Sequence, residues 1–156
     1  MCKPNVISFP LLVLSALAGA SGCATFAVAT PEGYVALEKS SLPYKAVSAE
    51  GAVLAVRVFD NRPRATLRFW AHVLDAELRS RQGYRPTIVR PITAHGAAGI
   101  ERHYITEIGG KKQVHIVALF VTDKRIYCVE ATAEAAQLQR ERARFDAFIQ
   151  SFKPLS

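Results

Sequence analysis

The sequence predicts an α+β domain, with a mostly antiparallel sheet of about six or seven strands flanked by two helices. Three short extended segments precede a first amphipathic helical pattern, four more extended segments follow it, and a second helical pattern comes last. Tight turns join several of the extended segments, and such turns connect antiparallel neighbours. The 156 residues suit one domain, and the 50% hydrophobic content is typical of a globular protein.

The first three strands are expected at residues 34–37, 45–48 and 52–59. Glu50-Gly51 has the composition of a hairpin turn between the second and third strands. The third strand carries four apolar side chains that are available for burial: Val53, Ala55, Val58 and Phe59.

Residues 64–82 form the clearest helical pattern in the chain. Apolar side chains recur at three- and four-residue spacing and would make one continuous stripe: Leu67, Trp70, Ala71, Leu74 and Leu78. Gly83 suits the left-handed position after the helix end, and Tyr84 is placed to pack back on the last turn. Because Trp70 belongs to this stripe, we expect it to be buried against the sheet.

Four further strands follow the helix, at residues 84–92, 100–108, 113–122 and 125–131. Two prolines favour an edge position for the first of them. Residues 94–99 are small and predict a loop, whereas Gly109-Gly110 and Asp123-Lys124 predict tight turns. The strand at 113–122 is apolar on both alternating faces, so we expect it in the middle of a sheet that is covered on both sides.

The last helix is expected from about residue 133 to residue 152, where Pro154 follows its end. Several features together resemble the PsbP-like α/β/α sandwich superfamily: the Gly33-Tyr34 entry, the tryptophan in the first helix, the Gly-Gly hairpin, the doubly apolar strand, and the aromatic segment Phe145–Phe152. The resemblance covers residues 33–154 and rests on element order and hydrophobic spacing. It implies a small docking or assembly module, because this superfamily has many bacterial lipoproteins and no shared catalytic residue.

The N-terminus has the pattern of an export signal, since Lys3 precedes an apolar run and no charged residue occurs from Val6 to Thr30. Ala20-Ser21-Gly22-Cys23 resembles the bacterial lipobox, in which the cysteine is acylated, with palmitate for example, and becomes the mature N-terminus. We therefore expect a lipoprotein signal peptide over 1–22, a lipid on Cys23, a tether over 23–33 that reaches at most ~35 Å, and a single domain over 34–154.

Two alternatives remain for this segment. Ala27-Val28-Ala29 fits an ordinary signal-peptidase site, which would release a soluble protein beginning at Thr30. The uncharged run could also span a bilayer, which takes about 20 apolar residues, although its second half is rich in small residues. For a lipoprotein, Ala24 rather than aspartate after the lipidated cysteine favours the outer membrane, facing the periplasm.

No catalytic, metal or cofactor site is predicted, so the protein is not expected to be an enzyme. Four histidines, His72, His95, His103 and His115, are candidates for metal ligands, but they lack the spacing of a metal motif. In a hairpin around Gly109-Gly110, His103 would lie opposite residue 116 and diagonal to His115. Cys128 lies in an apolar strand and is expected to be a buried, inert thiol.

The formal net charge of +7 leaves two interpretations open: solvated arginine-rich faces without a partner, or contacts with acidic or anionic partners. The candidate contacts with an anionic surface are Arg140, Arg142 and Arg144 in the last helix. Nucleic acid is not expected to be a partner of an exported protein. The sequence therefore predicts a lipid-anchored envelope protein that docks another envelope protein, or alternatively a sensor or carrier with a small-ligand pocket between helix and sheet.

Overall fold

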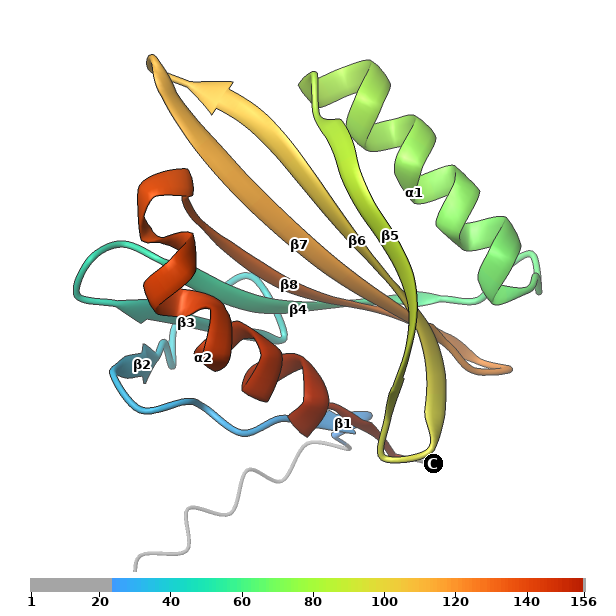
Figure 1. Cartoon of the computed structure of the whole chain (residues 1–156). Coiled ribbons are helices and arrows are strands. Elements are labelled where there is room, and N and C mark those ends of the chain that lie inside the picture. The colour runs from blue at the N-terminus through green and yellow to red at the C-terminus, as the bar shows by residue number, and fades with distance from the viewer. Residues whose placement is uncertain (1–23, 156) are drawn as a thin grey trace, which may run out of the picture.

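The computed structural model describes residues 24–155 and places a seven-stranded antiparallel sheet between two helices (Figure 1). Its strands, in the spatial order β2-β3-β4-β8-β7-β6-β5, are β2 (Tyr34–Ala36), β3 (Tyr44–Ser48), β4 (Val53–Asp60), β5 (Arg85–Ala94), β6 (Ala97–Ile108), β7 (Lys111–Val121) and β8 (Arg125–Glu134). The helices are α1 (Leu67–Gln82) and α2 (Leu138–Ser151). This architecture confirms the predicted α+β class and strand number.

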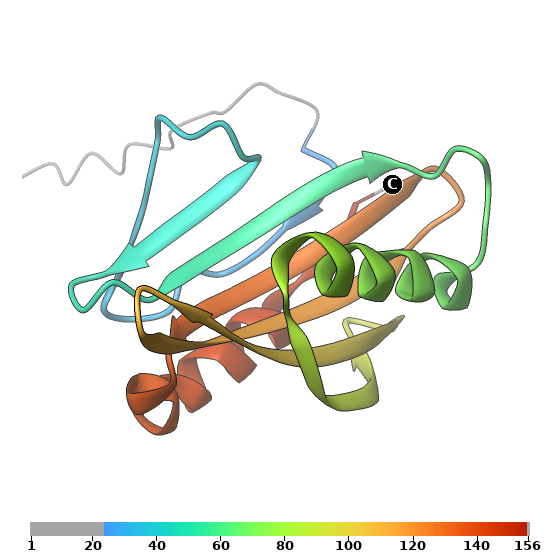
Figure 2. The same cartoon turned by 90° about the horizontal axis from the view of Figure 1, so that it is seen from above.

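Two hydrophobic cores lie on the two faces of the sheet, one under each helix. Figure 2 shows the two helices on different sides of the sheet. Because side chains alternate along a strand, Ile116 and Phe120 of β7 face α2, whereas Val117 and Leu119 face α1. All four are almost completely buried. The expectation that this strand lies centrally and is covered on both faces is confirmed.

Helix α1 begins at Leu67, three residues after the predicted start, because Thr66 caps it. The Thr66 hydroxyl accepts a hydrogen bond from the backbone N–H of Phe69 at 3.3 Å. The helix ends as predicted: Gly83 has a φ of 64° and its N–H donates to the carbonyl of Leu78.

Two predicted boundaries in the second half of the chain are wrong. Residues 94–99 do not form a loop, because His95 and Gly96, with φ of 45° and 80°, make a two-residue turn directly between β5 and β6. The last helix does not begin at residue 133, because β8 continues to Glu134 and pairs there with Gln113 of β7. A short 3₁₀ turn, Ala135–Gln137, then leads into α2.

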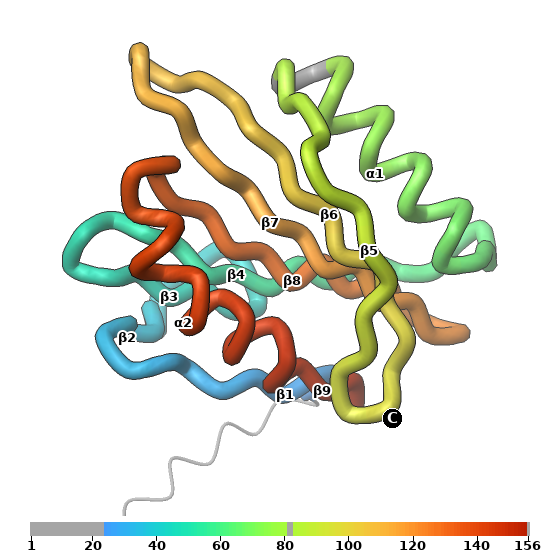
Figure 3. The backbone as a smooth tube through the Cα atoms, in the orientation of Figure 1, coloured from blue at the N-terminus to red at the C-terminus, as the bar shows by residue number. Residues whose placement is uncertain are grey.

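The N-terminal end of the described chain is packed onto the domain (Figure 3). β1 (Phe26–Ala27) pairs with β9 (Lys153–Pro154), and the Phe26 ring lies 6.3 Å, between centroids, from the rings of both Tyr127 and Phe152. Part of the segment expected to be a tether over 23–33 is therefore a strand of the folded body. Cys23 and the signal peptide expected over 1–22 lie outside the described residues.

Among residues 24–155, neither helix is long and apolar enough to cross a membrane.

Candidate functional site

An apolar groove lies between α1 and the neighbouring strands β4 and β8, and we call it the α1 groove. Its volume is about 380 Å³. The side chains that line it are mainly apolar and include Phe59, Trp70, Val73, Leu74, Ile126 and Cys128. The groove is the candidate binding site of the domain, because it combines large apolar side chains with access from solvent.

The α1 groove exists because α1 lies over β6 and β7, while β2 and β3 lie to its side (Figure 2). On β4, Leu54, Val56 and Val58 belong to the core under α2, so the alternate residues point to the α1 side. Phe59 is one of these and is 51% exposed, although we expected it to be available for burial. The sequence indicated that Phe59 is an apolar strand residue, but not that no helix covers its side of the sheet at this point.

Trp70 forms one wall of the α1 groove and is held there by Asn61. The Trp70 Nε1–H donates to Asn61 Oδ1 at 2.7 Å, and Asn61 Nδ2 donates to the carbonyl of Thr122 at 2.9 Å. Asn61 is itself buried. Trp70 packs against the core under α1, as expected, but it is half-buried because its indole N–H reaches this polar anchor.

Cys128, which lines the groove, is an unreactive thiol. Burial, and to a smaller extent the charge of Glu130, raises the pKa of the Cys128 thiol to about 12. The thiol therefore stays protonated at neutral pH and is a poor nucleophile, as its apolar strand predicted. The mainly apolar lining of the α1 groove suits an apolar group of a ligand or partner.

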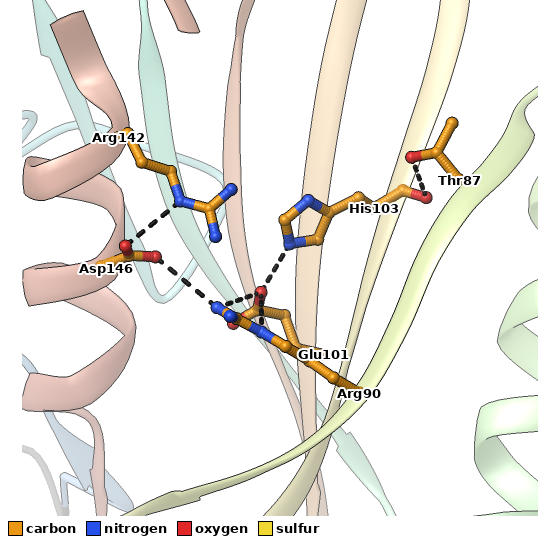
Figure 4. A network of polar contacts seen from close by, with 6 residues as sticks. All are labelled: Thr87, Arg90, Glu101, His103, Arg142 and Asp146. Atoms are coloured by element: carbon orange, nitrogen blue, oxygen red, sulfur yellow. Dashed lines mark hydrogen bonds and ion pairs between the residues drawn. The ribbon is translucent and has the colours of Figure 1, made fainter. Parts of the chain in front are cut away.

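A polar network on the opposite face joins β5, β6 and α2 (Figure 4). Glu101 is only 2% exposed. Its Oε1 lies 2.5 Å from His103 Nε2 and accepts from Arg90 Nε at 2.9 Å. Burial alone would raise the pKa of Glu101, but the hydrogen bond from His103 and the Arg90 charge outweigh it and lower the pKa.

This network fastens α2 to the sheet. Asp146 of α2 lies 3.8 Å from Arg90 Nη2 and accepts from Arg142 Nε at 3.2 Å. Within residues 24–155, no hydroxyl or thiol side chain hydrogen-bonds to the His103 ring, and the nearby Thr87 hydroxyl donates to the backbone carbonyl of His103 instead. These contacts join β5, β6 and α2, so the network supports a structural role.

The candidate metal ligands are scattered. His72 is exposed on α1, His95 lies in the β5–β6 turn, and His103 and His115 point to opposite faces of the sheet. His103 pairs with Ile116, as the hairpin count predicted. No group of three or more metal-binding side chains occurs in the part of the chain that the structure describes.

The three arginines expected to contact an anionic surface each meet a carboxylate. Arg140 lies 3.2 Å from Glu50, and Arg142 lies 3.2 Å from Asp146. Arg144 lies 3.1 Å from Glu141. Arg142 thus belongs to the network beside β5, whereas Arg140 and Arg144 lie about a turn apart on another side of α2. The structure does not gather them into one patch.

Sequence reasoning missed the role of Phe26 and Thr25, because they lie among small residues that resemble a linker. The one available signal was the aromatic ring of Phe26 between Thr25 and Ala27. Phe59 was identified as apolar, and its exposure depends on the placement of α1, which is a property of the tertiary structure.

Comparison with known proteins supports the fold. No protein-family description matches the chain, and no curated protein matches its sequence. Among solved structures, LpqN of Mycobacterium tuberculosis, described as involved in cell envelope biogenesis, is similar with a TM-score of 0.69 and 11% identity over 84% of this chain and 83% of that one.

Two further structures have the same fold. A protein of unknown function from Pseudomonas aeruginosa, PA94, is similar with a TM-score of 0.60 and 15% identity, covering 79% of this chain and 82% of that one. The PsbP protein of the cyanobacterium Synechocystis sp. PCC 6803 has a TM-score of 0.56 and 10% identity, covering 88% and 96%. The chain therefore has the PsbP-like sandwich fold, which its element order resembled.

Proposed function

We propose that this protein is a lipid-anchored lipoprotein of the bacterial cell envelope, on the outer membrane and facing the periplasm, and that it docks another envelope protein without catalysing a reaction. The lipobox pattern at Cys23 supports the anchor. The similar fold of LpqN, which is described as involved in cell envelope biogenesis, supports the envelope location.

The packing of β1 supports processing at Cys23 over cleavage after Ala29. Cleavage after Ala29 would remove Phe26, whose ring contacts Phe152 and Tyr127 in the core, and would remove the partner strand of β9. Processing before Cys23 leaves this strand in place. The packing of β1 therefore favours a mature protein that begins at Cys23 over one that begins at Thr30.

The exposed apolar α1 groove is the observation that carries the docking function. Its occupant in our proposal is an amphipathic helix of a partner protein, lying beside α1 over β2, β3 and β4. Adjacent strands are ~4.8 Å apart, so the three strands β2, β3 and β4 span roughly 10 Å, which is about the diameter of a helix. Val35 on β2 is 67% exposed and extends the apolar surface in this direction.

Charge on this surface favours an acidic side chain in the partner helix. Lys45 of β3 lies opposite Ala55 of β4 and so shares the α1 side of the sheet. Lys45 has no carboxylate partner within residues 24–155, whereas Arg57 on the same face is paired with Glu130 at 3.0 Å. A partner helix with an acidic residue at Lys45 would complete this surface.

Site-specific photo-crosslinking in intact cells tests the proposal. A photoreactive phenylalanine analogue in place of Phe59 should crosslink an envelope protein, and mass spectrometry should place the linked peptide in an amphipathic helix. The same analogue at Ile108, which is 61% exposed at the far end of β6, is the matched control. Lys45→Glu should reduce the Phe59 crosslink severalfold.

Two results would contradict docking. Crosslinking at Phe59 no stronger than at Ile108 would leave the α1 groove without a protein partner. A crosslinked lipid or other small molecule in place of a peptide would favour the ligand carrier, since the groove volume of about 380 Å³ is within the range of small-molecule sites.

A further inference from the structure

We propose that the end of the domain where β1 and β9 pair rests directly on an anionic bilayer, with its lysines against lipid phosphates. We call this end the anchor end and define it by Thr25, Arg62, Lys124, Lys153 and Leu155. The inference rests on the proposed lipid anchor at Cys23 and adds to it an orientation and a headgroup-binding surface.

The first step is that little free chain separates Cys23 from the folded body. The Thr25 carbonyl accepts hydrogen bonds from the Tyr127 hydroxyl at 2.9 Å and from the Leu155 N–H at 2.8 Å. Consecutive Cα atoms are about 3.8 Å apart, so Cys23 lies at most ~7.6 Å from Thr25. A lipid on Cys23 would therefore hold this end of the domain at the membrane surface, in place of a reach of ~35 Å.

The second step is that several segments meet where the chain emerges. Ala24 and Thr25 border a depression of about 610 Å³ together with Lys124 and Leu155. Lys124 is in the β7–β8 turn, and its carbonyl accepts from the N–H of Asn61 at 2.9 Å, so the loop before α1 reaches the same end. Figure 2 shows the end of the chain near this turn.

The third step is the charge of the anchor end. Five cations lie on these segments: Arg62, Arg64, Lys124, Arg125 and Lys153. Two carboxylates accompany them: Asp123, paired with Arg64, and Asp60, paired with Arg125.

The other three cations, Arg62, Lys124 and Lys153, are exposed and have no carboxylate partner among the described residues. Unpaired cations at a membrane surface attract anionic headgroups. The exposed Leu155 beside them adds an apolar contact.

The arginines of α2 are placed differently. Ser151 at the C-terminal end of α2 hydrogen-bonds to the Ala29 N–H and so lies near β1, whereas Arg140 is eleven residues earlier, ~17 Å along the helix axis. Arg140 and Arg142 are moreover paired with carboxylates. An orientation set at Cys23 therefore favours the anchor end as the headgroup contact, over the α2 arginines that the sequence suggested.

A proximity measurement on the full-length protein purified from its own membrane tests this inference. A fluorophore is attached at Leu155→Cys or, as the matched control, at Ile108→Cys. Both positions are exposed, whereas Cys128 is buried and unreactive. Ile108, the last residue of β6, pairs with Lys111 at the start of β7. The eleven residues of β7 separate that end of the sheet from the β7–β8 turn by ~35 Å. The protein is reconstituted in vesicles of phosphatidylglycerol and phosphatidylcholine that carry a headgroup quencher.

The Leu155 probe should be quenched severalfold more than the Ile108 probe. Lys124→Gln combined with Lys153→Gln should reduce the extra quenching that phosphatidylglycerol gives over pure phosphatidylcholine. Arg140→Gln combined with Arg142→Gln should leave it unchanged. Raising salt from 0.1 M to 1 M should have the effect of the lysine variant, because the Debye length falls from about 10 Å to about 3 Å.

The outcomes separate the two proposals. Mass spectrometry of the same sample reports whether Cys23 is acylated, and an unacylated protein would overturn the anchor and this inference together. An acylated protein with equal quenching at Leu155 and Ile108 would overturn the orientation alone. A loss of quenching in the Arg140 and Arg142 variant, but not in the lysine variant, would move the headgroup contact to α2.

Discussion

At the scale of the residue, His115 is a neutral histidine enclosed by the core under α1. Burial, helped by the charge of Arg57, lowers the pKa of His115 to about 4. Its Nδ1 lies 2.7 Å from the Thr132 hydroxyl, and its ring centroid lies 5.3 Å from that of Tyr84. An unfolded histidine has a pKa of about 6.5, so between these pH values the unfolded chain binds a proton that the folded domain does not.

The free energy of unfolding should therefore decrease as the pH falls from about 6.5 to about 4, by about 3 kcal/mol from this residue. Urea titrations at pH 7 and pH 4.5 measure the change. His115→Gln cannot titrate in this range and should show a smaller decrease, while other groups contribute alike to both proteins. Equal pH dependence in the two proteins would mean that the His115 pKa is not lowered.

Single residues also show what a sequence can predict. Cys128 and Gly83 were placed correctly, because an apolar strand and a helix end are local patterns. Trp70 packs against the core under α1 as expected, but it is only half-buried and Phe59 is exposed, because their exposure depends on where α1 lies and on the anchor that Asn61 provides. The buried contact of Glu101 with His103 likewise needs two residues on one face of β6 and an arginine from β5.

At the scale of the element, the type and order of the helices and long strands followed from periodicity, whereas their ends did not. β8 continues to Glu134 because its ladder with β7 continues, and the pairing partner is more than ten residues away in the sequence. β1 could not be predicted from local pattern, because its partner β9 lies at the other end of the chain. Long-range pairing decides such boundaries.

The role of β1 leads to a prediction about stability. Phe26→Ala removes a half-buried ring that stacks on Phe152 and meets Tyr127 edge-on. It should lower the free energy of unfolding by about 2 kcal/mol, somewhat less than the usual cost for a fully buried phenylalanine. Urea unfolding measures this loss. Phe69→Ala on the exposed side of α1 is the control and should cost less, and equal costs would mean that β1 adds nothing to the folded body.

At the scale of the whole molecule, the two faces of the sheet differ in a way that suits docking. The α2 face is closed, since Phe145, Phe148 and Phe152 are fully buried and the Glu101 network fastens the helix. The α1 face is open beside β4, where the groove lies. One sealed face gives a stable body, and the apolar surface of the other is the one that the proposed docking function would use.

Whether the whole protein is attached to a membrane depends on how its N-terminus is processed. Two cysteines near the N-terminus, Cys23 and Cys2, provide a matched pair of variants to test this processing. Cys23→Ala should abolish incorporation of a radiolabelled fatty acid, because no thiol remains at the lipobox. Cys2→Ala removes a cysteine from the same segment and should leave the label intact. N-terminal sequencing of the wild-type protein provides an independent readout. Anchoring at Cys23 would be contradicted if the Cys23→Ala protein retained the fatty-acid label. It would also be contradicted by a mature N-terminus at Thr30, which would require a folded body that is stable without β1.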